Sequence, residues 1–266
     1  MRPGELAPLV AAALPDEGLA ADDLERCCAG AEVLGDDRGA AVIRITHTGG
    51  FTSAWLLLLA VAPASQRRGI GRALLGTAVE RARAAGAADL HVGNAAPRYV
   101  WPGVDFAFTA ALALFEACGF EPNGAGFNMG IATSFRAEPP SGVTIERETG
   151  AGAAGLAERA YPHWVDETTR SVEHGTCFAA RAGGETIAFA CHSANRRGWI
   201  GPMASDPARQ RGGVGRALLG AVCADLATEG LATADIAWVG PVGFYAKCGA
   251  RVSRVFRTAR LPLSTP

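Results

Sequence analysis

The stretch Gln66-Arg67-Arg68-Gly69-Ile70-Gly71 and its near copy Gln210-Arg211-Gly212-Gly213-Val214-Gly215 decide how this 266-residue chain is organised. Around them, residues 61–76 (VAPASQRRGIGRALLG) align without gaps to residues 205–220 (SDPARQRGGVGRALLG), with 11 of 16 positions identical. A second landmark follows in the same order, as FEACGF at 115–120 and YAKCGA at 245–250. Two landmarks in one order indicate duplication of a whole domain rather than of a single loop.

Each loop follows a strand-like run and precedes a long amphipathic helix. The first amides of such a helix lack partners and favour an anion, and glycine lets the backbone approach phosphate oxygens closely. A Walker-type loop is excluded because Lys247 is the only lysine. A dinucleotide fingerprint is disfavoured because Leu74 and Leu218 occupy its third glycine position. An ordinary capped helix start is the remaining alternative, and the second copy weakens it. Both loops are therefore predicted to bind a pyrophosphate. Charge-assisted contacts are expected from Arg67, Arg68, Arg72, Arg211 and Arg216.

The pattern of apolar residues and glycines predicts the same succession of elements in both halves. In the first half it predicts strands at 31–35, 39–46, 53–62, 88–93 and 127–133 and helices at 69–85 and 107–118; residues 5–29 look helical, and no opening strand is found. In the second half it predicts strands at 143–147, 176–182, 185–193, 197–205, 233–238 and 251–260, with helices at 150–160, 162–171, 213–229 and 241–248. Gly183-Gly184 is a plausible hairpin turn. The expected fold class is α/β, in the mixed α+β sense, with helices flanking a mixed sheet in each copy.

The polar segment Ala137–Gly142 is rich in proline and glycine and is expected to link the copies. We place one domain at residues 1–137 and the other at 138–266. The first copy has about 14 extra residues around Asn94–Asp105. Within this insert, Arg98–Asp105 is aromatic and turn-rich, so it is expected to form a lid, a bridge between domains, or simple packing.

The composition excludes several classes of partner. The formal net charge is −1, and no basic, aromatic-studded segment occurs, which disfavours nucleic acid. The longest strongly apolar stretch, Ala54–Ala64, is too short to cross a bilayer, and the start of the chain lacks a signal-peptide pattern. Seven cysteines without a CxxC pair suggest free thiols in a reducing cytosol. We expect a cytoplasmic protein, monomeric or homodimeric, with no metal site.

The two loops resemble the central motif of the GNAT superfamily of acetyl-CoA-dependent N-acetyltransferases, a strand followed by (Q/R)-x-x-G-x-(G/A). The downstream helices that end in Cys-Gly are similar to the family's closing pattern. The resemblance covers nearly the whole chain as two tandem copies, and it implies acetyl-CoA as the cofactor and a sheet that splays open beside the central strand. It further implies that the pantetheine arm pairs with one strand edge in each copy, and that the loops hold the pyrophosphate. The residues concerned are Leu59, Ala60, Val61, Gln66, Arg67, Arg68, Gly69, Ile70, Gly71 and Arg72 in the first copy, and Met203, Ala204, Ser205, Gln210, Arg211, Gly212, Gly213, Val214, Gly215 and Arg216 in the second.

The resemblance also implies a tyrosine that protonates the leaving thiolate, on the helix after the fifth strand. The second copy has Tyr245 at this position and the first has Phe115, which cannot donate a proton. A purely anchoring role for Tyr245 is the alternative. The first copy is thus expected to be degenerate for catalysis while still able to bind CoA. The oxyanion donor is expected to be a backbone N–H near Met203 or Ala204.

The general base is predicted less directly. His192 ends a strand beside the expected cleft, and its ordinary pKa near ~6.5 suits proton removal. His163, Asp166 and Glu167 are alternatives, as is a chain of water molecules. The leading hypothesis is a bacterial N-acetyltransferase that transfers acetyl directly to a small amine in a ternary complex. A non-catalytic acetyl-CoA sensor and a mycothiol-synthase-like acyltransferase are the alternatives.

Overall fold

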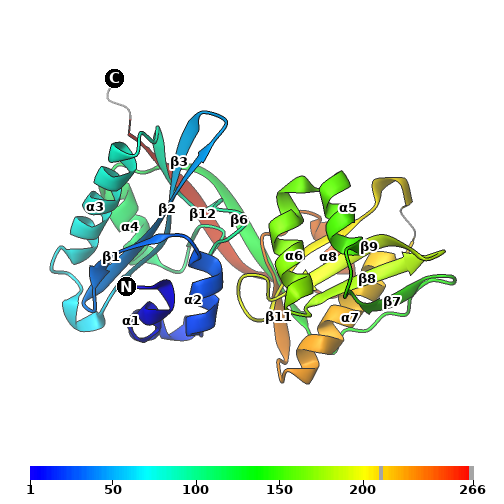
Figure 1. Cartoon of the computed structure of the whole chain (residues 1–266). Coiled ribbons are helices and arrows are strands. Elements are labelled where there is room, and N and C mark those ends of the chain that lie inside the picture. Colours follow the sequence, from blue (N-terminus) through cyan, green and yellow to red (C-terminus); the bar gives the residue numbers. More distant parts are fainter. Residues whose placement is uncertain (210–211, 264–266) are drawn as a thin grey trace. The chain divides into compact units, whose positions relative to one another are not determined.

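The computed structural model describes residues 1–209 and 212–263 (Figure 1). The chain forms two compact units, and each is considered by itself. Unit 1 comprises Met1–Gly126 together with Arg254–Pro266, and unit 2 comprises Phe127–Ser253. Each unit thus contains residues from both halves of the sequence. The boundary between the duplicated copies near residue 138 stays a prediction.

Unit 1 begins with short helices and continues with a sheet. The helices are η1 (Pro3–Leu6), α1 (Ala7–Ala13), η2 (Pro15–Glu17) and α2 (Ala21–Cys28), and the strands β1 (Glu32–Asp36), β2 (Gly39–Thr48) and β3 (Phe51–Val61) follow. After η3 (Pro63–Ser65) come α3 (Ile70–Ala84), β4 (Asp89–Val92), β5 (Val104–Asp105) and α4 (Thr109–Ala117). The next strand, β6 (Glu121–Ala132), begins in unit 1 and continues into unit 2 from Phe127. No strand precedes β1 among the described residues, in agreement with the missing opening strand of the sequence pattern.

Unit 2 repeats this order with an added first strand. Its elements are β7 (Thr144–Arg147), α5 (Gly152–Ala160), η4 (Pro162–Trp164), α6 (Val165–Glu173), β8 (Cys177–Ala182), β9 (Glu185–His192) and β10 (Trp199–Ser205). They continue with η5 (Pro207–Arg209), α7 (Val214–Thr228), β11 (Thr233–Ile236) and α8 (Val242–Lys247). The last strand, β12 (Arg251–Pro262), begins in unit 2 and belongs to unit 1 from Arg254 onward. The predicted hairpin joins β8 and β9, where Gly183 and Gly184 have φ of 60° and 81°. Positive φ at both central residues is what a tight hairpin requires.

The sheets are mixed, as predicted, but each receives one strand from the far part of the sequence. Unit 1 has the order β1-β2-β3-β4-β12, with β5 also paired to β12. Unit 2 has the order β6-β11-β10-β9-β8-β7. In unit 1, β3 and β4 are parallel; in unit 2, β10 and β11 are parallel. The last strand of the chain therefore pairs with β4, and β6 pairs with β11.

Alternating side chains divide the core of unit 2 between two helix layers. Along β9, Ala188 and Ala190 pack with residues of α7 and α8, whereas Phe189 and Cys191 pack with residues of α5 and α6. A period of two is expected for a strand buried on both faces. In unit 1, α3 and α4 pack together on one face, over β2, β3 and β4. No helix among the described residues has the length and apolar character needed to cross a membrane.

Candidate cofactor and active site

The parallel strand pair of each unit opens into a cleft. In unit 1, β3 and β4 are paired only from Ala54/Leu90 to Leu56/Val92. In unit 2, β10 and β11 are paired only at Trp199/Asp235 and Ile200/Ile236. The central strand bulges where pairing stops: Leu57 is the extra residue of β3, and Gly201-Pro202 faces one residue of β9. Bulges bend a strand and end its pairing, which accounts for the splay.

The hydrogen-bond alternation of the central strand decides which backbone groups face the cleft. The Ala62 N–H donates to Arg38 O at 2.9 Å, so Ala62 directs its backbone groups toward β2. In an antiparallel pair, every second residue of a strand directs its N–H and C=O toward the partner strand, and the residues between direct theirs away from it. Leu59 and Val61 therefore direct their N–H and C=O groups into the cleft. Ala60 directs its groups toward β2, which removes it from the predicted set of backbone partners.

Unit 2 has the same alternation. Asp206 N–H donates to Ile187 O at 2.8 Å, so Met203 and Ser205 present their backbone groups to the cleft. Ala204 is paired toward β9, and of the two expected oxyanion donors only the Met203 N–H has the required direction. The Ser205 carbonyl accepts a hydrogen bond from the Tyr161 hydroxyl at 2.7 Å. In unit 1 the equivalent Val61 carbonyl accepts from Gln66 Nε2 at 3.0 Å.

The two glycines of each loop serve different purposes. Gly69 and Gly213 precede the first helical residue with φ of 83° and 90°, and a Cβ on either would meet little or nothing within 4 Å. They provide the left-handed turn that exposes the helix amides. A Cβ on Gly71 would lie 3.3 Å from the Leu114 side chain, and one on Gly215 would lie 3.2 Å from Phe244. The second glycine therefore allows close packing of the following helix, a role the sequence interpretation did not assign.

The arginines of the first loop are exposed and available. Arg67 has φ of 61°, a left-handed conformation uncommon outside glycine, and with Gly69 it turns successive N–H groups to one side. Arg67 and Arg68 have no hydrogen-bond or ion-pair partner among the described residues. Arg72 makes only a long contact, 3.4 Å from Nη1 to Ala117 O. In the second loop Gly212 and Arg216 are exposed, Val214 is the first residue of α7, and the predicted Gln210 and Arg211 lie outside the described residues.

A cavity of about 760 Å³ occupies the cleft of unit 1. It extends from the loop, where Gln66, Arg67, Gly69, Ile70, Gly71 and Arg72 line it, along Leu56–Val61 of β3. Its opposite wall is formed by α4, including Phe115, and by the insert. Both the size and the mainly apolar wall are typical of a ligand site. The predicted first-copy residues, apart from Arg68, are thus brought together around one space.

Tyr245 lies in α8, which packs in the same core layer as α7. Its side chain is 7% exposed and packs in the core with the edge of the Phe244 ring, at 4.9 Å between centroids. Burial raises the pKa of the Tyr245 hydroxyl to about 12. The equivalent Phe115 is also buried and lines the cavity of unit 1. The structure thus places both rings at the same point of the repeated fold.

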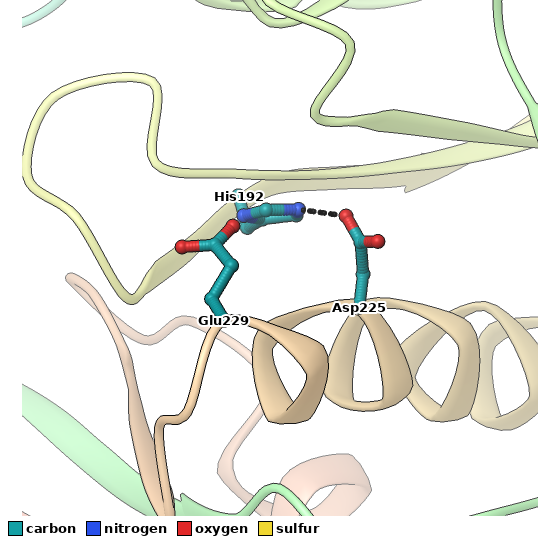
Figure 2. A group of neighbouring side chains, drawn as sticks. All are labelled: His192, Asp225 and Glu229. Carbon is teal, nitrogen blue, oxygen red and sulfur yellow. Dashed lines mark hydrogen bonds and ion pairs between the residues drawn. The ribbon is translucent and has the colours of Figure 1, made fainter.

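His192 is buried and contacts a group of charged side chains at the far end of α7. Its Nε2 lies 2.9 Å from Asp225 Oδ2, its Nδ1 lies 3.0 Å from Ser193 Oγ, and Glu229 is beside the ring (Figure 2). Burial lowers the pKa of His192, although Asp225 opposes this shift. Asp225 follows Val214 by 11 residues, or about 16 Å of helix, so the imidazole is far from the loop-bearing end of the helix. His192 pairs with Ile200, where the pairing of β10 and β11 ends, and its assignment as the base stays a prediction.

The same three residues have the composition of a metal site, since their ligand atoms lie within 4.8 Å of one another. Both carboxylates, however, already hold guanidinium groups. Arg147 Nη2 is 2.5 Å from Asp225 Oδ1, and Arg197 Nε is 3.2 Å from Glu229 Oε2. Because these cations would repel a divalent ion, the arrangement fits an ion-pair network better.

The other proposed bases differ in their surroundings. Asp166 pairs with Arg170 at 2.7 Å. Glu167 is 6% exposed and accepts a hydrogen bond from Asn195 Nδ2 at 3.1 Å. His163 is exposed at the surface and packs against the Trp164 ring. None of the three is brought to Tyr245 by a contact among the described residues.

Sequence reasoning missed one feature of the cleft edge. Asn94 and Trp238 lie two residues after the ends of β4 and β11, and both have positive φ, 57° and 49°. Such a conformation is rare for a bulky residue and is concentrated at functional sites. Asn128 Oδ1 accepts the Trp238 N–H at 3.0 Å and holds this turn, while its buried Nδ2 has no hydrogen-bond partner in the described structure. The alignment could have paired Asn94 with Trp238, but nothing in it indicates Asn128.

Two family models match the chain. The acetyltransferase (GNAT) domain matches residues 23–122, and the acetyltransferase (GNAT) family matches residues 146–250. Together they account for most of the sequence and divide it as the internal repeat does. No curated protein matches the chain.

Several solved structures share the fold at low identity. A tandem GNAT protein from the clavulanic acid biosynthesis pathway has 15% identity and a TM-score of 0.71, with 97% of this chain and 94% of that chain covered. A GCN5-related N-acetyltransferase from Sphaerobacter thermophilus has 18% identity and a TM-score of 0.64, with 99% and 93% covered. The glucosamine N-acetyltransferase region of a fungal multi-domain β-N-acetylglucosaminidase has 18% identity and a TM-score of 0.73, with 97% covered, but the chain spans only 36% of that protein.

Proposed function

The chain belongs to the GNAT superfamily, with two GNAT domains in tandem, and we propose that it transfers an acetyl group from acetyl-CoA to the amine of a small molecule. The transfer is direct, in a ternary complex of enzyme, acetyl-CoA and amine. The free thiols of all seven cysteines are consistent with our assignment of the protein to the cytoplasm. It acts as a monomer or a homodimer.

The cavity of unit 1 carries the cofactor part of this proposal. Its loop end offers helix amides and the exposed side chains of Arg67 and Arg72 for a pyrophosphate. Along β3, the cleft-facing groups of Leu59 and the Val61 N–H are suited to pair with the amide groups of a pantetheine arm. The thioester would then reach the apex of the splay, beside Leu56 and Val92. Unit 2 offers the same backbone groups at Met203 and Ser205.

The chemical step is assigned to unit 2. The neutral amine attacks the thioester carbonyl, and the Met203 N–H stabilises the oxyanion of the tetrahedral intermediate. The C–S bond then breaks, and the Tyr245 hydroxyl donates its proton to the departing thiolate. The ammonium proton leaves to water or to a nearby base, and the tyrosinate is reprotonated from solvent. Tyr245 supports this assignment because it is the phenol at the position that Phe115 occupies in unit 1.

A second candidate, binding of acetyl-CoA without transfer, is favoured by the cavity of unit 1. The residues that line it include no aspartate, glutamate, histidine, lysine or cysteine. An amine that arrives as an ammonium would find no carboxylate to bind it and no base to take its proton. We therefore assign to unit 1 the retention of acetyl-CoA and to unit 2 the transfer.

Calorimetry and a thiol-release assay with a panel of amines test both candidates. We expect two molecules of acetyl-CoA per chain, reduced to one by Arg67→Glu or by Arg216→Glu. CoA release that depends on an amine should survive Arg67→Glu and be lost with Arg216→Glu. Saturable binding without CoA release on any amine would leave only the binding function, and no binding would refute both.

A further inference from the structure

The insert of unit 1 enters the cleft where β3 and β4 diverge. The chain leaves the strand edge at Gly93, directly after the last paired residue of β4, and returns at Gly103, directly before β5. The Asn94 N–H donates to Pro102 O at 3.2 Å and so joins the two ends of the insert. Both β4 and β5 pair with β12, so the insert lies at the apex of the splay. This is the end of the cavity opposite the phosphate-binding loop.

The insert is held firmly against the rest of unit 1. Arg44 of β2 donates to the carbonyl oxygens of Ala95 and Arg98, at 3.3 Å and 2.5 Å. A Cβ on Gly93 would come within 2.4 Å of Pro102 O, and one on Gly103 within 2.4 Å of Arg257 O. Contacts this close leave no space under the turn. The insert is therefore a fixed wall of the cavity rather than an open lid.

Trp101 is the largest side chain that this wall contributes, and its indole is held in place. Its Nε1 donates to Glu17 Oε2 at 2.9 Å. Glu17 is in turn paired with Arg254 at 2.6 Å, and Arg254 also binds Asp105 at 2.5 Å. The two carboxylates are 6% and 8% exposed at their side chains. A buried, fully paired network of this kind restricts the indole to one orientation.

The chemical character of this end of the cavity suits an acyl group. Its wall is formed by side chains of β3, β4, β5 and the insert. They are Leu56, Val92, Tyr99, Val100, Trp101 and Val104. These are apolar or aromatic groups, which bind an alkyl chain and cannot solvate an ammonium or a carboxylate.

From these contacts, and on the basis of the cofactor site proposed for unit 1, we propose that Trp101 limits the length of the acyl group that unit 1 accepts on its CoA ligand. An acetyl group fits in the space between the thioester sulfur and the Trp101 indole. A longer chain must displace the indole, together with its hydrogen bond to Glu17. Unit 1 is thus selective for short acyl-CoA thioesters, and Trp101 is the residue that determines this selectivity.

Calorimetric titration of the full chain tests the proposal with CoA, acetyl-CoA, butyryl-CoA and hexanoyl-CoA. Arg216→Glu is used as the background, so that binding to unit 1 is observed. We expect hexanoyl-CoA to bind at least tenfold more weakly than acetyl-CoA. Trp101→Ala should strengthen hexanoyl-CoA binding and so reduce the ratio of the Kd for hexanoyl-CoA to the Kd for acetyl-CoA at least fivefold. Trp55→Ala is the matched control, because Trp55 lies on β3 but does not line the cavity, and it should leave the ratio unchanged.

Val100→Ala provides a second opening of the same wall in case Trp101→Ala does not fold, as judged by circular dichroism. Val100→Ala should lower the ratio of the Kd for hexanoyl-CoA to the Kd for acetyl-CoA at least twofold. An unchanged ratio in the folded variants would refute selection by Trp101 while leaving the cofactor site intact. Absence of saturable binding of any CoA ester, with Arg67→Glu causing no change, would instead refute the cofactor site itself.

Discussion

Replacing Tyr245 with phenylalanine is the most direct test of the proposed chemistry. Burial raises the pKa of its hydroxyl to about 12, whereas an ordinary thiol has a pKa of ~8.5. Full proton transfer to a solvated thiolate would thus be uphill by about 3.5 pKa units, or ~5 kcal/mol. The phenol therefore first donates a hydrogen bond as the C–S bond breaks, and it gives up its proton only to a thiolate whose pKa is raised by the same buried surroundings. A hydrogen bond to a charged group contributes about 1.5–3 kcal/mol, which corresponds to a ten- to hundredfold loss of kcat.

The assay measures CoA thiol release at saturating acetyl-CoA and amine between pH 6 and pH 9.5. Because the phenol stays protonated throughout this range, its ionisation should add no descending limb to the profile of kcat. Tyr245→Phe should lower kcat uniformly with pH, and should leave the KM for acetyl-CoA nearly unchanged.

The chain has three tyrosines, which offer two matched controls. Tyr99→Phe removes a hydroxyl from the cavity of unit 1 and should leave kcat unchanged. Tyr161→Phe removes the hydrogen bond to the Ser205 carbonyl and should raise the KM for acetyl-CoA rather than lower kcat. A Tyr245→Phe enzyme with unaltered kcat would show that the phenol only anchors α8. A loss equal in all three variants would show that the effect is structural.

Three further predictions concern stability, each followed by urea unfolding. Burial lowers the pKa of His192, so as the pH falls the unfolded chain binds a proton before the folded chain does. The free energy of unfolding should therefore decrease as the pH falls below ~6.5, the ordinary pKa of histidine. His192→Gln should make this decrease smaller. A slope unchanged between pH 7 and pH 5 would contradict it. Gly69→Ala should destabilise the protein by about 1 kcal/mol because φ is positive there, and by more than Gly71→Ala, whose Cβ would be closest to the end of the flexible Leu114 side chain. The reverse order would contradict the geometry. Arg254→Met removes the guanidinium from two buried carboxylates and should destabilise the protein by about 3 kcal/mol. A loss under about 1 kcal/mol would show that water replaces the guanidinium.

Much of the fold could be predicted because its signals are local. Periodicity, turn glycines and helix-terminating glycines lie within a few residues of the element they define, and the predicted and observed strands and helices agree closely. The hairpin at Gly183-Gly184 is one such case. Strand partners are different, because pairing is decided over the whole chain. Nothing near β12 in the sequence indicates that it pairs with β4, or that β6 pairs with β11.

The parts of the candidate site that depend on a local loop motif could be predicted from the sequence. The parts that depend on the direction in which a strand residue points its backbone or side chain could not. The loops could be found because helix amides and glycines bind anions whatever the fold around them. The direction of a group along a strand requires the register, so Ala60 and Ala204 could not be separated from their neighbours beforehand. The partner of the His192 ring, Asp225 in the last part of α7, could not be predicted from the sequence for the same reason.

The two units have nearly the same loop and the same splayed strands, so these features cannot account for any difference in what they do. The differences lie at the other end of each cleft. Unit 1 has Phe115 and the wall containing Trp101, while unit 2 has Tyr245 and turns sharply at Trp238 without an insert. If both copies bind a pyrophosphate, as proposed, both require the same loop, whereas a copy that does not catalyse transfer can have apolar side chains at its acceptor end. An insert at the apex of the splay closes the cleft to amines and still leaves the cofactor edge of β3 accessible. On the proposed assignment of transfer to unit 2 and retention to unit 1, the phenyl ring of Phe115 and the wall containing Trp101 both suit a site that retains acetyl-CoA.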